Sequence, residues 1–221
     1  MSTTTDSPAS TKDRLLDVTE ELVAEHGFDA VSLRQITTDA GTNLAAVNYH
    51  FGSREALFRE VFTRRVEPIN QRRLALLNTL EANTPAGKPL PLEDVLDALF
   101  LPVVTIYRDS ERRREVFFRF MGRCMGETDP DRTKFIAELF RTVVERFTDA
   151  FERALPGAHR ADIELHFLFS VGVMAHTLCF FQQMPHYTGH ECEKLTAEEL
   201  AARMITYTAA GFRTLTPPRK K

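Results

Sequence analysis

The stretch Ser32–Leu57, SLRQITTDAGTNLAAVNYHFGSREAL, carries the strongest structural signal in the chain. Ser32, followed three residues later by Gln35, has the pattern of a capping box, which begins a short helix. Gly41 ends that helix, because glycine readily adopts a positive φ, and a second short helix follows at Leu44–Asn48. Two short helices joined by a tight glycine turn are typical of a helix-turn-helix.

The second of these helices has an unusual composition for a buried helix. Leu44–Asn48 is mostly small, carries one amide and is followed by Tyr49 and His50, while Val47 and Phe51 can pack inward. Small side chains allow close approach to DNA, and amides, methyl groups and hydroxyls can read base edges or touch phosphate. We interpret it as a recognition helix; a helix that only packs on its neighbours is the competing interpretation. The predicted DNA-binding residues are Arg34, Thr42, Asn43, Ala45, Ala46, Asn48, Tyr49, His50 and Arg54.

The segments on either side complete a small N-terminal domain. Apolar residues at helical spacing predict a first helix at Lys12–His26, so that residues 12–53 form a three-helix domain. Residues 1–11 are rich in Ser and Thr and are predicted to be a disordered tail, not a signal peptide. Ser53 is placed to cap a longer helix over 54–80, which connects this domain to the rest of the chain.

Five short sequence motifs follow one another within the N-terminal domain and the start of the connecting helix. They are Gly27-Phe28, Ser32–Ile36, Ala40-Gly41, Val47–Phe51 and Ser53–Leu57. Together they resemble the DNA-binding domain of TetR-family transcriptional regulators, over about the first third of the chain. The resemblance implies a homodimer that binds a pseudo-palindromic double-stranded operator. It also implies that the connecting helix acts as a lever, which transmits ligand binding to the recognition helix.

The rest of the chain is predicted to be helical, and no alternating strand pattern competes. The fold class is therefore all-α: a helix-turn-helix domain followed by a helical ligand-binding and dimerisation domain over 54–213, with a basic tail at 214–221. A loop rich in Pro and Gly is expected at 83–91. The helices expected beyond it are Leu92–Arg108, Ser110–Gly126, Asp131–Leu155, Arg160–Gln183 and Thr196–Phe212.

Two of these helices are candidates for the dimer interface. Ile163–Phe181 is almost continuously apolar, so another surface must cover it. The last helix contributes Leu200, Met204, Ile205 and Tyr207. A two-fold four-helix interface would cover both helices. Such a dimer would place two recognition helices about 34 to 36 Å apart, at successive major grooves.

The C-terminal half is rich in Phe and Met, which fill ordinary cores and also line adaptable apolar cavities. Several segments, among them Asn43–Phe51, Phe118–Gly122 and His166–Leu168, resemble TetR-type regulators that respond to long-chain fatty acids or acyl-CoA. Arg119 could pair with an acid head group, and an internal salt bridge is the alternative. The predicted ligand-binding residues are Phe100, Phe117, Phe118, Arg119, Met121, Met125, Phe147, Phe167 and Met174.

Composition and missing motifs exclude other classes. The net charge of -3 requires any basic patch to be local. No Gly-x-Ser-x-Gly, HExxH, ExxH or CxxC motif is present, so we expect neither an enzyme nor a cofactor. His186, His190 and Cys192 match no standard metal site, and three cysteines without pairing fit buried thiols in a cytoplasmic protein. We also expect that no stretch approaches the length needed to span a bilayer.

These observations predict a repressor that a small apolar ligand releases from its operator. A long-chain fatty acid or acyl-CoA is the ligand that the second resemblance implies. Two alternatives stay open: an efflux or drug-type regulator with another hydrophobic ligand, and a helical sensor or adaptor that acts through protein contacts without DNA. Steep loss of DNA affinity with added salt would separate a DNA regulator from an adaptor.

Overall fold

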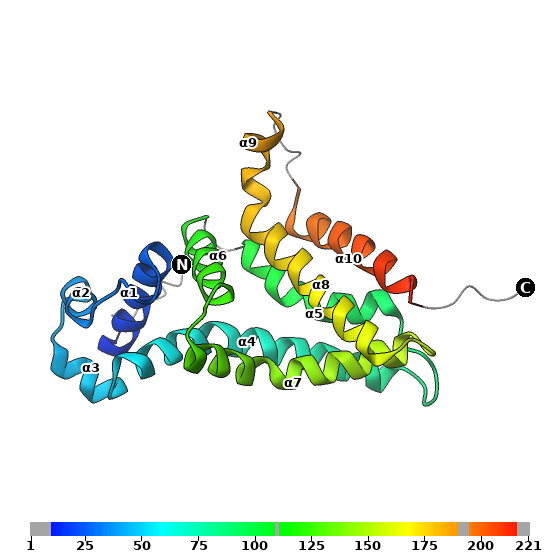
Figure 1. Ribbon diagram of the computed structural model, residues 1–221, viewed down its shortest axis with the longest axis horizontal. Helices are drawn as coiled ribbons and strands as arrows, with labels where there is room; N and C mark the ends of the chain where they lie inside the picture. The colour runs from blue at the N-terminus through cyan, green and yellow to red at the C-terminus, as the bar shows by residue number, and fades with distance from the viewer. Residues whose placement is uncertain (1–9, 109–110, 190–194, 216–221) are drawn as a thin grey trace, which may run out of the picture. The chain divides into compact units, whose positions relative to one another are not determined.

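The structure is a computed structural model of the 221-residue chain, and it describes residues 10–108, 111–189 and 195–215. In these residues it contains helices and no strand, which confirms the predicted all-α class (Figure 1). The elements are α1 (Thr11–His26), α2 (Leu33–Asp39), α3 (Leu44–Phe51), α4 (Arg54–Asn83), α5 (Leu92–Val104), η1 (Thr105–Arg108), α6 (Glu111–Met125), α7 (Pro130–Ala154), α8 (Arg160–Phe180), η2 (Phe181–Gln183), α9 (Met184–Thr188) and α10 (Ala197–Arg213).

The helix starts follow the capping residues of the sequence. The Thr196 and Glu199 side chains form a complete capping box at the start of α10. Ser10 accepts a hydrogen bond from the Asp13 N–H at 3.1 Å, so α1 begins at Thr11, inside the segment predicted as a tail. The rest of that tail, residues 1–9, lies outside the described residues, as does 216–221 of the predicted basic tail.

Several helix boundaries differ from the prediction, among them the end of α3, which is Phe51 rather than Asn48. α4 continues to Asn83, three residues beyond its expected end. The segment predicted as a break around Pro185 is the short helix α9, which ends at Gly189 with a left-handed φ of 70°. Pro185 stands in the first turn of α9, where a missing N–H costs no intrahelical hydrogen bond.

The chain forms two compact units, which differ from the predicted domains. The first unit contains the described residues up to Val66 together with Glu115–Phe135, and the second contains Glu67–Arg114 and the described residues from Ile136 onward. α4 therefore contributes to both units, its first part to one and its second part to the other. Most of α6 belongs to the first unit, although the sequence placed it with the ligand-binding domain.

An aromatic cluster forms much of the core of the first unit. The Phe28 ring lies 5.5 Å from that of Phe58 and 6.1 Å from that of Phe120. Phe62 extends the cluster, with ring distances of 6.1 Å to Phe120 and 6.0 Å to Phe135. Phe120 is fully buried, so α6 is part of this hydrophobic core rather than a helix on its surface.

A buried carboxylate ties α1 to α4 in the same unit. The Glu20 side chain is buried, and its oxygens lie 2.6 Å from Arg65 Nη2 and 3.3 Å from Arg64 Nη2. Arg64 also pairs with the more exposed Asp17, at 2.8 Å. A buried carboxylate is tolerated only when it is paired and hydrogen-bonded, so this cluster fixes α4 against α1.

In the second unit, α4 and α7 run parallel to each other. Asn70 donates to the Leu139 carbonyl at 3.1 Å, and Arg146 lies 2.7 Å from a Glu81 carboxylate oxygen, so residue numbers rise together along both helices. α10 packs against α5 and also lies beside α8 (Figure 1). The Phe212 ring of α10 stacks on that of Phe151 at 4.4 Å, which closes the core of this unit.

α8 is also long and apolar enough to cross a membrane. Its most apolar 18-residue window has a mean hydropathy of 1.5, and 28% of that window is buried. The expectation that no stretch approaches the length of a membrane span is therefore wrong for this helix. Length and apolar composition also describe a helix that another protein surface covers.

Glu20→Ala is expected to lower the free energy of unfolding by about 2 to 3 kcal/mol, because it leaves two partly buried guanidinium groups without their carboxylate. Asp17→Ala, on the same helix, is the matched control and should cost less than about 1 kcal/mol, since its ion pair is exposed to solvent. Urea unfolding measures both, and equal losses would contradict the assignment of Glu20 as the tie.

Candidate nucleic-acid interface

Local hydrogen bonds build the helix-turn-helix. Ser32 Oγ accepts from the Gln35 N–H at 3.2 Å, which provides the N-cap predicted for α2. Gly41 takes a φ of 60° in the turn, a left-handed conformation that favours glycine. Asn43 Oδ1 accepts from the Ala46 N–H at 3.1 Å and is thus the N-cap of α3. These bonds set where each short helix begins.

α3 has one buried face and one exposed face. Val47 is completely buried and holds the helix on the first unit, while Phe51 is half-buried. Tyr49 is 85% exposed. Of the nine predicted DNA-binding residues, Arg34, Asn43, Ala45, Asn48 and Tyr49 are exposed, and Thr42, Ala46, His50 and Arg54 are half-buried.

The exposed groups suit contacts with duplex DNA. Asn48 offers an amide donor and acceptor, the pair that recognises an adenine edge in the major groove. The Tyr49 ring meets the His50 ring edge-on at 5.0 Å, which supports the position of its phenol hydroxyl. Asn43 uses its side-chain oxygen for the N-cap, so its main role is to begin the helix.

Arg54, one of the predicted DNA-binding residues, has a structural role within the first unit. Its Nε donates to the Val31 carbonyl at 3.1 Å, and its Nη2 donates to the carbonyls of Val31 and Phe28. The guanidinium also lies over the Phe58 ring, 4.7 Å from its centre. This fork of donors matches the carbonyls of the α1–α2 loop and ties that loop to α4, while the DNA contact of Arg54 stays a prediction.

Several basic side chains of this unit are engaged with other protein groups. Lys12 forms an ion pair with Glu60 at 2.8 Å, and Arg14 Nε donates to the Ala40 carbonyl at 3.3 Å. Arg34 of α2 is exposed. Any electrostatic attraction to phosphate is therefore local, as expected from the net charge of -3.

Side chains of α6 and of the first turn of α7 give this unit a second support that the sequence did not predict. Arg132 contacts Asp29 at 3.0 Å and Glu127 at 2.7 Å, and its guanidinium lies over the Phe28 ring at 5.5 Å. Arg123 of α6 donates to the Glu25 carbonyl at 3.2 Å. Isolated arginines carry no periodic signal, so only the folded chain reveals these contacts.

The predicted ligand-binding residues divide between the two units. In the first unit, Phe117 and Phe118 are buried and Met121 is half-buried, whereas Met125 is exposed. Arg119 is also exposed and pairs with Glu115 at 2.7 Å, one turn away on α6. The structure gives no support to Arg119 and Met125 as ligand contacts, because Glu115 already pairs with the Arg119 guanidinium and the Met125 side chain lies at the surface.

The other four predicted ligand-binding residues lie in the interior of the second unit. Phe100, Phe147, Phe167 and Met174 are buried and come from α5, α7 and α8. Phe167 lies 6.2 Å, ring to ring, from Phe151 of the core. This interior combines aromatic rings with a flexible thioether, a composition suited to an apolar guest.

The described cysteines and histidines show no arrangement for metal binding. Among the described residues, no group of three or more metal-binding side chains lies together, and His190 and Cys192 lie outside them. Burial raises the pKa of the Cys124 thiol well above its ordinary range, and burial also raises that of Cys179. Neutral thiols are poor nucleophiles and poor ligands.

The arrangement defines a class of protein: a regulator that presents a short recognition helix from one helical unit and carries a second, apolar helical unit. Family models support the same division. Residues 15–61 match the model "Bacterial regulatory proteins, tetR family", and residues 97–211 match "Tetracyclin repressor-like, C-terminal domain". The chain belongs to the TetR family of transcriptional regulators, which confirms the predicted family and the prediction that it is not an enzyme.

The individual proteins that resemble this chain share little sequence identity with it. The HTH-type transcriptional repressor AcnR of Corynebacterium efficiens is 29% identical over 72 residues, which cover 31% of this chain and 38% of that protein. A TetR-family regulator of Bordetella parapertussis shares the fold with a TM-score of 0.65 and 16% identity, over 94% of this chain and 98% of that one. The fatty acid degradation regulator FadR of Bacillus halodurans shares the fold with a TM-score of 0.64 and 14% identity, over 94% of this chain and 99% of that one.

Arg54→Ala is expected to lower the free energy of unfolding by about 2 kcal/mol, because the carbonyls of Phe28 and Val31 lose their charged donor. The exposed Arg34→Ala serves as the control and should change stability by less than about 0.5 kcal/mol. Urea unfolding at neutral pH compares the two, and an unchanged stability of the Arg54→Ala protein would contradict this structural role.

Proposed function

We propose that this protein is a sequence-specific transcriptional repressor that inserts α3 into the major groove of operator DNA. The exposed face of α3 carries the proposal: Tyr49 and Asn48 point outward, while Val47 anchors the opposite face. The family match supports a DNA-binding regulator. Repression is the activity in the name of AcnR, of which the chain spans 38%, so it is part of the proposal.

The repressor acts as a homodimer built on α8 and α10. Exposed apolar side chains gather on α8, where Leu168 is 63% exposed and Leu165, Phe169 and Phe180 are also exposed. Tyr207 of α10 is exposed, but Leu200, Met204 and Ile205 are buried within the unit, so α10 offers less free apolar surface than the sequence predicted. A second copy that presents the same surface would cover these side chains.

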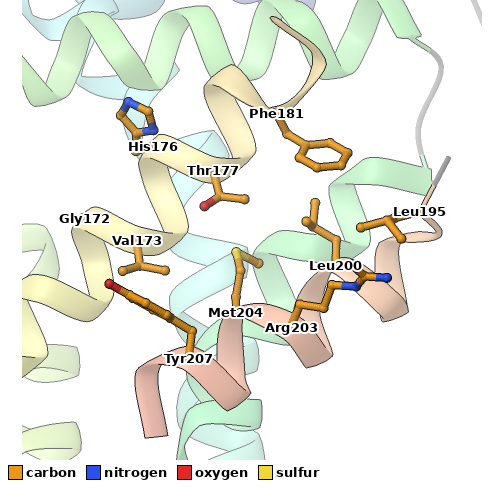
Figure 2. A pocket seen from close by; sticks show the side chains of 10 residues that line it. All are labelled: Gly172, Val173, His176, Thr177, Phe181, Leu195, Leu200, Arg203, Met204 and Tyr207. Carbon is orange, nitrogen blue, oxygen red and sulfur yellow. The ribbon is translucent and has the colours of Figure 1, made fainter. Parts of the chain in front are cut away.

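The surface proposed for the dimer contains a groove. It has a volume of about 580 Å³ and lies between α8 and α10. Figure 2 shows Met204 and Thr177 pointing into it, with Tyr207 reaching toward Val173. A partner's side chain seated there would interdigitate with these residues, as facing helices do in four-helix packing.

A hydrophobic effector bound in the second unit would control DNA binding. The buried Phe100, Phe147, Phe167 and Met174 provide the apolar surroundings, and α4 contributes residues to both units. A ligand that binds one conformation of the dimer more tightly shifts the population toward it and releases the operator. FadR of Bacillus halodurans, a fatty acid degradation regulator by name, has the same fold, which supports a long-chain acyl compound as the ligand class.

Asn48→Ala and Tyr49→Phe should each weaken binding to a duplex that the wild-type protein selects from a random library, by about tenfold, because each removes one base or phosphate contact. Electrophoretic mobility shifts at several salt concentrations measure this affinity. Arg34→Ala should make the slope of log affinity against log salt concentration shallower by about one, which is the contribution of a single phosphate contact.

Tyr187→Phe is the matched control for Tyr49→Phe, since Tyr187 is 75% exposed but lies on α9 of the second unit. It should leave DNA affinity unchanged. Retention of wild-type affinity by both α3 variants would remove the assigned role of that helix. Failure of the wild-type protein to select any duplex would instead favour an adaptor that acts through protein contacts.

Leu168→Arg should convert the dimer to a monomer of 25.2 kDa, because it places a charge in the apolar surface that a second copy covers. Met125→Arg is the control, as Met125 is 55% exposed but lies on α6. Light scattering after gel filtration gives the masses. A wild-type monomer, or dimers of both variants, would contradict an interface on α8.

A further inference from the structure

One buried cation in the second unit lacks an anionic partner. Arg73 of α4 is 5% exposed. Its Nε donates to the Leu99 carbonyl at 2.9 Å, its Nη1 donates to Asn70 Oδ1 at 3.2 Å, and its Nη2 lies 3.7 Å from Met174 Sδ. All of these acceptors are neutral, and among the described residues no carboxylate forms an ion pair with this guanidinium.

This charge cannot be removed by proton loss at neutral pH. Burial lowers the pKa of Arg73 to about 10, which still leaves the group protonated under physiological conditions. A buried charge without a counter-ion is costly in a medium of low dielectric constant. The buried cluster of Glu20 with Arg64 and Arg65, in contrast, contains both signs. Among the residues that the structure describes, every acceptor of Arg73 is neutral.

The acceptors of Arg73 explain part of its position. Leu99 lies three residues before Pro102, where the proline interrupts the hydrogen bonds of α5, so Arg73 reinforces a weakened turn. That role requires only Nε. Nη2 faces a thioether, which is a weak acceptor on a flexible side chain. Met174 can move away from Nη2 without the loss of a strong hydrogen bond, which opens one edge of the guanidinium to a ligand.

We infer that Arg73 binds the carboxylate of the effector, and that the effector is an aliphatic monocarboxylate. The inference rests on the proposed function of the second unit as a ligand sensor. Nη1 and Nη2 form the edge that matches a carboxylate in two parallel hydrogen bonds, and the buried Phe100 and Phe167 of the same unit suit the chain. A thioester or ester presents a neutral carbonyl and leaves the charge of Arg73 uncompensated.

The test measures the thermal unfolding of the full-length protein with free acids of 8, 12 and 16 carbons, their methyl esters and the matching alcohols, all below their micelle concentrations. At least one acid should raise the melting temperature by about 5 °C or more near a hundredfold excess over its Kd. The ester and the alcohol of the same length should give clearly smaller shifts. Equal shifts for acid and ester, or no shift with any acid, would overturn the inference.

Arg73→Gln should weaken binding of the active acid by about 30-fold or more, measured by calorimetric titration, and should leave the response to the ester unchanged. Arg146→Gln is the matched control, because its guanidinium pairs with Glu81 in the same unit; it should bind the acid as the wild type does. Undiminished acid binding by Arg73→Gln would contradict the proposal. If that variant does not fold, the comparison of acid with ester on the wild-type protein decides.

A negative result in the acid-binding test can be distinguished from a negative result for the proposed function. A wild-type protein that selects a duplex and forms a dimer, but shows no preference for a free acid, would still be a DNA-binding regulator with another effector. A protein that selects no duplex would refute the regulator, whatever its response to acids. The two measurements therefore give independent outcomes.

Discussion

The structure depends on how a helix of eight residues is held in place. α3 is too short to be stable in water by itself, so its direction comes from the packing of Val47, which is completely buried, and from the N-cap at Asn43. Every outward side chain of α3 inherits its position from these two contacts. A groove-reading helix needs this support, because base contacts require fixed geometry.

The contacts that hold α3's surroundings are mostly ionic and come from distant parts of the chain. Glu20 joins α1 to α4, Arg54 joins α4 to the α1–α2 loop, and Arg132 joins the first turn of α7 to the same loop. In the second unit, α4 is tied by Asn70 and Arg73. A ligand at Arg73 would thus act on the same helix that supports the DNA-reading unit, which gives the population shift a physical route.

Much of the architecture could be predicted because its signals are local. Ser32, Asn43 and Thr196 begin helices through hydrogen bonds to residues three positions away, and these signals do not require the rest of the fold. The composition of α3 likewise predicted that Val47 packs inward and that Asn48 and Tyr49 are exposed. The place of α6 could not be predicted, since its Phe120 is as apolar as the residues of either unit and only the folded chain decides which core it joins.

Three arginines show what could not be predicted from the sequence. Arg54, Arg73 and Arg119 all lie on helices beside apolar residues, and the sequence assigned Arg54 to phosphate and Arg119 to a ligand. The sequence by itself determined the helices, the helix-turn-helix and the family. The tertiary structure alone decided that Arg54 ties a loop, that Arg119 faces solvent and that Arg73 is buried with no ion pair to any described carboxylate. The reason is physical: capping and periodicity are local, whereas burial and the neutralisation of charge depend on residues far apart in the chain.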